Sequence, residues 1–336
     1  MPEETMRVPL PDKQVGLVAV GLHPDNGAFR TYDMLQIAAL ADSVGFRSAD
    51  VWGFGLFETA MTVGHDDPWL CLQGMKRALP HTARRAALHA RTLVGGREVP
   101  RPLVDRFIAL AVKNGVDEFA VFDEENRLSD SPVFLAAVAS GKPVVAVLRW
   151  DAAAFPTAGA LCAAAAKCAE AGAASVALAD VGGTMTPTLA FNAVRALKEG
   201  TSLPVEFGCT NRSGLANLCA WEAVRAGADA LLTVFSCLFG ADSYPSSESI
   251  AASLEYTPAD THMPLPSMID VNTRAKEALP RLQQAPARAA GPVCPDWSAA
   301  EKLAEGLARS EEDVMLCALF PESAPDFLRY KYALDV

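Results

Sequence analysis

The sequence lacks several features that mark well-known functional classes. No window of the 336 residues approaches the roughly 20 consecutive apolar residues that span a bilayer. Its first 20 residues show no basic stretch followed by an apolar one, so no secretory signal is predicted. Basic residues are outnumbered, with 29 Lys and Arg against 40 Asp and Glu. Because a nucleic-acid surface or a polybasic membrane patch needs clustered Lys and Arg, we expect neither nucleic-acid binding nor membrane insertion.

Paired cysteines and glycine-rich phosphate loops are also missing. The eight cysteines form no C-x-x-C pair, and most lie in apolar runs. This pattern predicts free buried thiols in a reducing cytoplasm, with zinc ligation as the minority interpretation. No G-x-G-x-x-G follows the first predicted strand, and there is no P-loop. The absence disfavours a doubly wound nucleotide-binding sheet, the structural alternative to a barrel.

What the sequence does contain is a regular alternation of short strand-like runs and longer helical runs. The strands are predicted at Val15–Leu22, Ser48–Trp52, Ala86–Thr92, Glu118–Phe122, Lys142–Trp150, Ser175–Ala179, Pro204–Gly208 and Ala228–Val234. Each is followed by a predicted helix, and eight such units over about 250 residues fit a (β/α)8 barrel. The predicted fold class is therefore α/β, a TIM barrel over residues 1–256.

The pattern changes after Tyr256. Residues 257–295 are rich in proline and predict irregular chain with one short helix near Asn272–Gln284. Amphipathic helices are predicted at Ser298–Arg309 and Glu311–Phe320. We expect residues 257–336 to form a short C-terminal helical appendage packed on the barrel, and the barrel mouth is one place that it could cover.

Several stretches are similar to one known family. They include RTYDMLQIA at Arg30, GFRSADVWGFGLFETA at Gly45, HDDPWLCL at His65, PLVDRFIALAVKNGVDEFAVFD at Pro102, ADVGGTMTP at Ala179, NRSGLANLCAWEAVRAGAD at Asn211 and DSYPSSES at Asp242. In these stretches the chain resembles the carboxyltransferase domain of pyruvate carboxylase and of the oxaloacetate decarboxylase α subunit, within the hydroxymethylglutaryl-CoA lyase-like barrels. SEEDVMLCALFPESAPDFLRYK at Ser310 resembles the end of the family's helical region. The resemblance implies a dimeric, metal-dependent barrel that works with biotin.

The family's metal ligands are absent at the matching positions. The family holds a divalent metal with a His-x-His pair after the seventh strand, where this sequence has Gly208 and Thr210. A carbamylated lysine before an aspartate corresponds to Ala179 before Asp180. The Arg-Asp pair of the first strand is replaced by Leu22-His23-Pro24-Asp25. Because Gly and Ala offer no lone pair and nothing then polarises a pyruvate carbonyl, we expect no metal and no covalently bound cofactor.

Two further family positions are also replaced. The substrate-binding Arg followed by Gly-Gln-Asn corresponds to His89-Ala90-Arg91-Thr92, and a threonine implied to relay a proton to biotin corresponds to Arg212. Arg91 and Arg212 could clamp a carboxylate or phosphate. The alternative is that they pair with local carboxylates and fill the vacated metal cavity; the candidate carboxylates are Asp180, Glu206, Asp123 and Glu124.

The candidate site is expected at the strand ends of the barrel. The catalytic candidates are Asp180, His89 and Arg212, and the ligand-binding candidates are Trp52, Arg91, His23 and Cys209. Asp180 could be a general base or could cap the following turn. Cys209 could be a nucleophile with His89 or His23 as its base, or an inert packed thiol. A minority alternative is a rebuilt metal site, in which His23, Asp25, His89 and Cys209 would be the ligands because their side chains are of types that bind metals.

Three functional hypotheses follow. In the first, a divergent carboxyltransferase-family barrel of the biotin-linked pyruvate/oxaloacetate type has lost metal-dependent catalysis and acts as a ligand-binding or non-catalytic subunit. In the second, a metal-independent carboxyltransferase or decarboxylase acts on a small oxoacid or carboxybiotin with Arg212, Arg91 and either Asp180 or His89. In the third, the family-like shell forms only a subunit interface. The sequence has no Met-Lys-Met biotin acceptor, so we expect biotin on a separate carrier, and a homodimer or a complex with family carboxylase or decarboxylase subunits.

Overall fold

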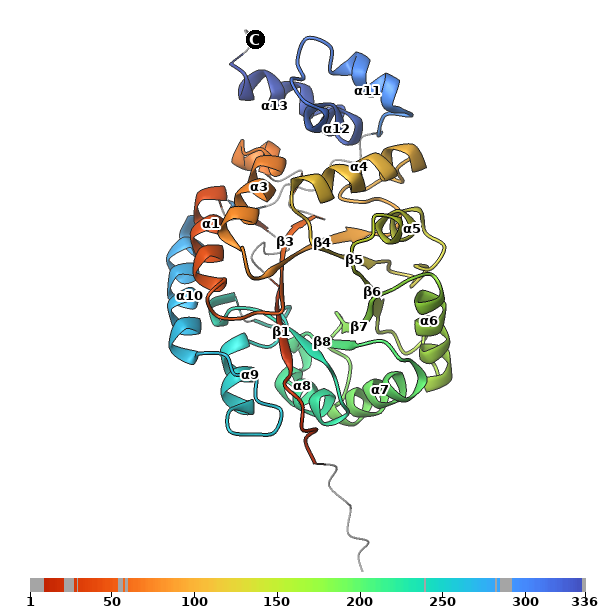
Figure 1. Ribbon diagram of the computed structural model, residues 1–336, viewed down its shortest axis with the longest axis vertical. Helices are drawn as coiled ribbons and strands as arrows, with labels where there is room; N and C mark the ends of the chain where they lie inside the picture. The colour runs from red at the N-terminus through yellow and green to blue at the C-terminus, as the bar shows by residue number, and fades with distance from the viewer. Residues whose placement is uncertain are drawn as a thin grey trace, which may run out of the picture.

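The computed structural model describes residues 9–20, 27–28, 30–53, 57, 60–238, 240–281, 283–284 and 292–333. At its centre, eight parallel strands close into a barrel (Figure 1). In their order around the barrel they are β1 (Gly16–Ala19), β3 (Ser48–Gly53), β4 (Ala83–His89), β5 (Glu118–Phe122), β6 (Val144–Arg149), β7 (Ser175–Asp180), β8 (Val205–Cys209) and β9 (Ala230–Thr233). The predicted TIM barrel and all eight of its strands are confirmed.

Helices surround the barrel on its outer side (Figure 1). They are α1 (Thr31–Ala41), α3 (Pro68–Ala78), α4 (Arg101–Asn114), α5 (Pro132–Ala139), α6 (Ala158–Glu170), α7 (Pro187–Gly200), α8 (Ala216–Arg225), α9 (Ser247–Leu254) and α10 (Leu265–Ala278). Short helical turns lie at Ala60–Gly64, Asn211–Ser213, Ser236–Leu238 and Leu279–Arg281. Of the helices in the described part of the chain, none is long and apolar enough to cross a membrane.

Local sequence sets where several helices begin. The hydroxyls of Ser131, Thr157 and Thr186 each accept a backbone N–H from the first turn of α5, α6 and α7. A proline follows the cap of α5 and of α7, where its missing N–H costs nothing. These caps lie directly after the loops that leave the carboxyl ends of the strands, so they fix the direction in which each loop enters its helix.

The barrel interior contains a charged layer near the amino ends of its strands. Arg85 on β4 is 1% exposed and donates to Glu206 of β8 over two N···O distances of 2.8 Å. In the closed order β4 and β8 lie four strands apart, so this ion pair crosses the barrel. Arg85 also donates to Glu118 at 2.6 Å. The predicted start of this strand at Ala86 was wrong, because Arg84 and Arg85 belong to the strand although they are charged.

The C-terminal region divides into two parts. Helix α10 packs against α1 and α9 on the outside of the barrel, and Gln283–Gln284 (β10) pairs antiparallel with Gly27–Ala28 (β2). The last helices, α11 (Trp297–Leu303), α12 (Glu311–Leu319) and α13 (Ala324–Lys331), lie together beside α3 and α4 (Figure 1). They therefore lie against the outer wall of the helical ring. Strand β10 of the same appendage pairs instead with β2 in the chain after β1, at the carboxyl end of that strand, and the expected position over the mouth stays a prediction.

Ion pairs and aromatic rings hold these last helices in place. Glu312 of α12 accepts from Lys113 at 3.0 Å and from Asn114 at 2.9 Å, both at the end of α4. Lys331 of α13 lies 2.6 Å from Asp313 and 2.6 Å from Asp67, the N-cap of α3. Between the barrel and the last helices, aromatic side chains form one cluster. Phe320 of the C-terminal region contributes one ring, and the barrel region contributes Trp52, Phe57, Trp69 and Phe107.

Candidate functional site

Gly208 faces the barrel interior near the mouth, at one of the two positions of the family's histidine pair. It lies two residues after the inward-facing Glu206 on the same strand, and alternate residues of a strand face the same side. A Cβ atom on Gly208 would lie 2.7 Å from Cε1 of Tyr244 and 2.8 Å from Cδ1 of Leu232. Real Cβ atoms do not approach neighbours this closely. The ring of Tyr244 and the side chain of Leu232 therefore occupy the space that an imidazole would need.

The surroundings of this position are apolar. Val18, Ala179, Ala230 and Leu232 form one buried cluster inside the barrel, against which Tyr244 packs. Ala179, which the resemblance aligns with a metal-binding lysine, is 1% exposed. Apolar side chains thus surround both of these positions on β7 and β8.

Asp180 and Thr210 are both engaged with the chain around them. The carboxylate of Asp180 is fully buried and accepts the backbone N–H of Met185 at 2.7 Å. The hydroxyl of Thr210 donates to the carbonyl of Val181 at 2.9 Å. Of the two roles considered for Asp180, this placement supports the cap of the turn after β7. Among the described residues, Asp180 is not part of any group of three or more His, Cys, Asp or Glu side chains whose ligand atoms could hold one ion, so this pair does not fit the family's metal.

Cys209 is a buried thiol that also contacts Asp180. Its Sγ is 3.4 Å from a carboxylate oxygen of Asp180, and the residue is fully buried. The hydrogen bond with Cys219, burial and the nearby Asp180 charge together raise the pKa of the Cys209 thiol far above its usual range. The protonated thiol is a poor nucleophile, so this environment supports the packing role.

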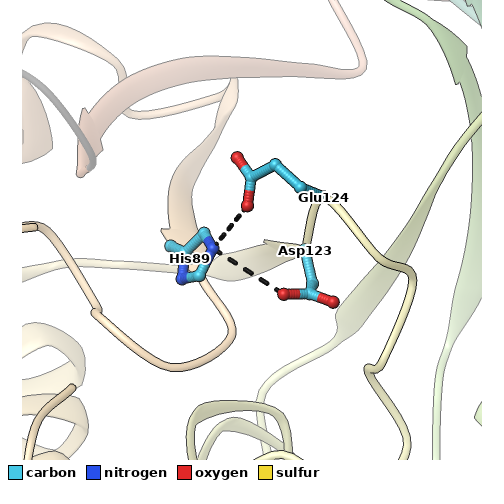
Figure 2. Close-up of side chains that lie close together, drawn as sticks. All are labelled: His89, Asp123 and Glu124. Carbon is cyan, nitrogen blue, oxygen red and sulfur yellow. Dashed lines mark hydrogen bonds and ion pairs between the residues drawn. The ribbon is translucent and has the colours of Figure 1, made fainter. Parts of the chain in front are cut away.

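His89 lies at the end of β4, where it forms a cluster with two carboxylates that follow β5 (Figure 2). Its Nε2 is 2.7 Å from Oε2 of Glu124 and 3.8 Å from Oδ1 of Asp123. The other carboxylate oxygen of Glu124 lies 3.0 Å from the guanidinium of Arg149 at the end of β6. Burial acts to raise the pKa of Glu124, but the hydrogen bond from His89 and the nearby charge of Arg149 hold it below its usual value.

This cluster has a donor set that suits a divalent cation, but the imidazole is oriented for a different role. The ligand atoms of His89, Asp123 and Glu124 lie within 4.8 Å of one another. However, the backbone N–H groups of Arg91 and Thr92 both point at Nδ1 of His89, each at 3.2 Å. Since Nδ1 accepts, the proton of the neutral ring is on Nε2, where a metal would need a lone pair. The cluster therefore fits a hydrogen-bonded His–carboxylate pair better than a metal site.

The two arginines of the expected clamp do not lie together. Arg91 follows β4 and lies 3.2 Å from Glu98, whereas Arg212 follows β8 and lies 2.6 Å from Asp242. Strands β4 and β8 are on opposite sides of the barrel. Each arginine thus has its own carboxylate, and neither of these carboxylates is among the four that the sequence suggested.

The remaining candidates are in different surroundings. Trp52 is fully buried, and its indole N–H donates to the carbonyl of Pro68 at 3.0 Å. It packs among aromatic rings between the barrel and the last helices, which is a role in the core. His23 and Asp25 lie outside the described residues. Of the seven candidates, the structure brings Cys209 next to Asp180 and places Arg91 after His89 in one loop.

Sequence reasoning missed the roles of Tyr244 and Glu124. Tyr244 belongs to the stretch DSYPSSES, which carried part of the resemblance, but only the fold places its ring over Gly208. Glu124 was considered only as a partner for an arginine, although its position directly after β5 is a signal for the barrel mouth.

Comparisons with known proteins agree with this architecture. No family model matches. The chain is 32% identical over 255 residues to a pyruvate carboxylase subunit of Methanocaldococcus jannaschii, covering 76% of this chain and 44% of that protein. It is 34% identical over 237 residues to the corresponding pyruvate carboxylase subunit of Methanothermobacter thermautotrophicus, covering 70% of this chain and 42% of that protein. The chain is a carboxyltransferase-family barrel related to pyruvate carboxylase.

Other members of this carboxyltransferase family match over similar lengths. The chain is 25% identical over 255 residues to the methylmalonyl-CoA carboxyltransferase 5S subunit of Propionibacterium freudenreichii, covering 75% of this chain and 50% of that protein. The carboxyl transferase domain of Rhizobium etli pyruvate carboxylase, solved with pyruvate and biocytin, superposes with a TM-score of 0.76. That match covers 91% of this chain and 56% of the other, and its 24% identity establishes the fold alone. The chain spans less than half the length of the two archaeal relatives.

Proposed function

We propose that this carboxyltransferase-family barrel has lost the metal-dependent reaction and acts as a ligand-binding or non-catalytic subunit. The observation that carries the proposal is the close contact of Gly208 with Tyr244 and Leu232, which leaves no room for a histidine. A divalent ion needs several ligands with free lone pairs, and the described residues at the family's positions offer an apolar cluster and two engaged side chains. Without the ion, the enolate of an oxoacid has lost its main source of stabilisation.

A subunit role is supported by the names of the relatives. Two are named as subunits of pyruvate carboxylase, and a third is the 5S subunit of a carboxyltransferase. We propose that this chain assembles in the cytoplasm, as a homodimer or with carboxylase or decarboxylase subunits. In such a complex it would meet biotin on a separate carrier protein.

The second hypothesis, metal-independent carboxyl transfer or decarboxylation, draws less support. It requires Arg91 and Arg212 to act on one oxyanion, and they follow strands on opposite sides of the barrel. It also requires a free proton acceptor. Both oxygens of Asp180 accept hydrogen bonds, and Nε2 of His89 bonds to Glu124.

Metal content and activity together test the proposal. The protein is produced with added zinc, manganese and cobalt, and its ions are measured by mass spectrometry beside oxaloacetate decarboxylation. We expect no stoichiometric ion and no decarboxylation above the protein-free rate. A stoichiometric ion with chelator-sensitive decarboxylation would refute the proposal. Decarboxylation that survives chelator and disappears in Arg212→Gln would support the metal-independent enzyme instead.

The variant His89→Ala separates the two places where an ion could lie. An ion that His89→Ala removes would belong to the cluster with Asp123 and Glu124, and the orientation argument for His89 would then be wrong. An ion that the variant retains would lie elsewhere in the mouth, and the loss of the family site would be refuted.

A further inference from the structure

A cavity lies at the end of the barrel opposite the mouth. Its volume is about 420 Å³. Four of its lining residues lie at or just before the amino ends of strands: Gly16, Arg47, Pro204 and Asp229. Thr261 and Met263 come from the chain after α9. Small-molecule sites in proteins have volumes of roughly 300–1,000 Å³, so this cavity is large enough for a ligand.

Three cations gather around this cavity. Arg47, in its wall, lies 3.3 Å from the buried Glu206. Lys13 and Lys198 both form ion pairs with Asp229, Lys198 at 2.9 Å. Because two lysines share the one carboxylate of Asp229, this group cannot balance both of them. Counted with the buried ion pairs behind them, four cations and four carboxylates balance here, because Arg85 also pairs with Glu118 and Asp50.

The cations face the solvent, whereas the carboxylates lie behind them. The side chains of Lys13, Arg47 and Lys198 are 44%, 33% and 30% exposed, but those of Asp229 and Glu206 are 15% and 0% exposed. Glu206 is also bound on its other side by Arg85. An incoming molecule therefore meets the positive groups first.

The cations are close enough to repel one another. Partial burial lowers the pKa of Lys13, and the positive charges of Lys198 and Arg47 lower it further. A bound anion would relieve this repulsion, because it would add negative charge between the three groups.

We propose that this cavity binds an anionic small molecule through a carboxylate or phosphate group held by Arg47, Lys13 and Lys198. The guanidinium and ammonium groups supply the charged hydrogen bonds that such groups need. The partly buried Met263 in the cavity wall offers apolar surface to the remainder of the ligand. The site is separate from the barrel mouth, so it does not depend on the proposed function.

Calorimetric titration of the whole chain tests the proposal. The probes are inorganic phosphate, phenyl phosphate and malonate, each at low ionic strength. We expect at least one probe to bind with one site per chain and to weaken as salt is added. Tighter binding of phenyl phosphate than of inorganic phosphate would indicate an ester with an apolar body, and a preference for malonate would indicate a carboxylate ligand. No saturable binding of any of the three would refute the proposal.

Matched variants locate the bound anion. Lys13→Gln and Lys198→Gln should each weaken binding about tenfold, since each removes a charged hydrogen bond. Arg195→Gln is the control, because Arg195 lies on the same helix as Lys198 but pairs with Glu199 at the surface. Binding that is equal in Lys13→Gln, Lys198→Gln and the unaltered chain would refute the proposal. Arg47→Gln is a further test, but its contact with Glu206 makes a thermal melt necessary beside it.

Discussion

Arg85 and Glu206 form a two-point ion pair inside the barrel, with both N···O distances at 2.8 Å. The two residues belong to strands on opposite sides of the barrel, β4 and β8, so their side chains span the barrel interior near the amino ends of the strands. Glu118, Asp50 and Arg47 extend this contact to a network of five charged side chains. Full burial without pairing would make any one of these charges costly.

The variant Arg85→Met should therefore lower the stability strongly. It leaves the carboxylates of Glu206 and Glu118 without their main partner, and such losses cost about 3–5 kcal/mol. Urea unfolding measures the change. Arg195→Met removes an exposed ion pair and should change the free energy of unfolding by less than about 1 kcal/mol. If the two variants were equally stable, the buried network would not contribute as argued.

Gly208→Ala should also destabilise the protein, by about 1–3 kcal/mol, because the added methyl group meets Tyr244 and Leu232. Tyr244→Ala removes one of these neighbours. In a double-mutant cycle measured by thermal melting, Gly208→Ala should cost less in the Tyr244→Ala background than in the unaltered chain. An identical cost in both backgrounds would mean that Tyr244 does not fill this space.

Cys209 should resist alkylation in the native protein. Its burial and its raised pKa both keep it in the unreactive thiol form. Iodoacetamide treatment followed by peptide mass spectrometry should show label on the half-buried Cys162 long before Cys209. Rapid native labelling of Cys209 would instead indicate an accessible thiolate and would restore its interpretation as a nucleophile.

Glu312→Gln tests how the last helices attach to the barrel wall. Burial acts to raise the pKa of Glu312, but hydrogen bonds from Asn114, its own backbone and Lys113 hold it below the usual value. A lowered pKa stabilises the folded state above the unfolded pKa of about 4.3, and the gain is lost as the pH falls through the folded value. The variant should thus be less stable by about 1 kcal/mol near neutral pH, and the difference should shrink below about pH 4. A difference that grows on acidification would contradict this sign.

The barrel could be predicted from the sequence because its strands have a simple pattern. Parallel strands buried on both faces read as continuous apolar runs, as in Ser175–Asp180, where every residue is buried. Arg85 broke this pattern, since the sequence gives no sign that Glu206, 121 positions later, lies across from it. Helix α10 begins seven residues before the predicted Asn272, because Pro266 falls in its first turn, where proline is tolerated. The predicted helix end at Gln284 was wrong, since Gln283–Gln284 is the strand β10.

The candidate site was less predictable, because its residues depend on contacts between loops. The sequence identified which family positions had changed, but not what fills them. Tyr244 reaches Gly208 from the chain after β9, and Glu124 reaches His89 from the chain after β5. The sequence suggested that Arg91 and Arg212 clamp one anion together, because both follow predicted strands. The order of the strands in the closed barrel places them on opposite sides of the mouth. The separate helix α13 was not predicted.

The aromatic cluster between the barrel and the last helices allows intrinsic tryptophan fluorescence to report on the attachment of these helices. Trp52 and Trp69 lie with ring centroids 5.0 Å apart. Phe57 meets both indoles edge to face and stacks on Phe320 of the terminal region, with ring centroids 6.2 Å apart. Lifting the terminal helices would admit water to both indoles and shift their emission to longer wavelengths. If the terminal helices detach while the barrel stays folded, the tryptophan emission maximum should therefore shift while the β-strand content measured by circular dichroism stays the same.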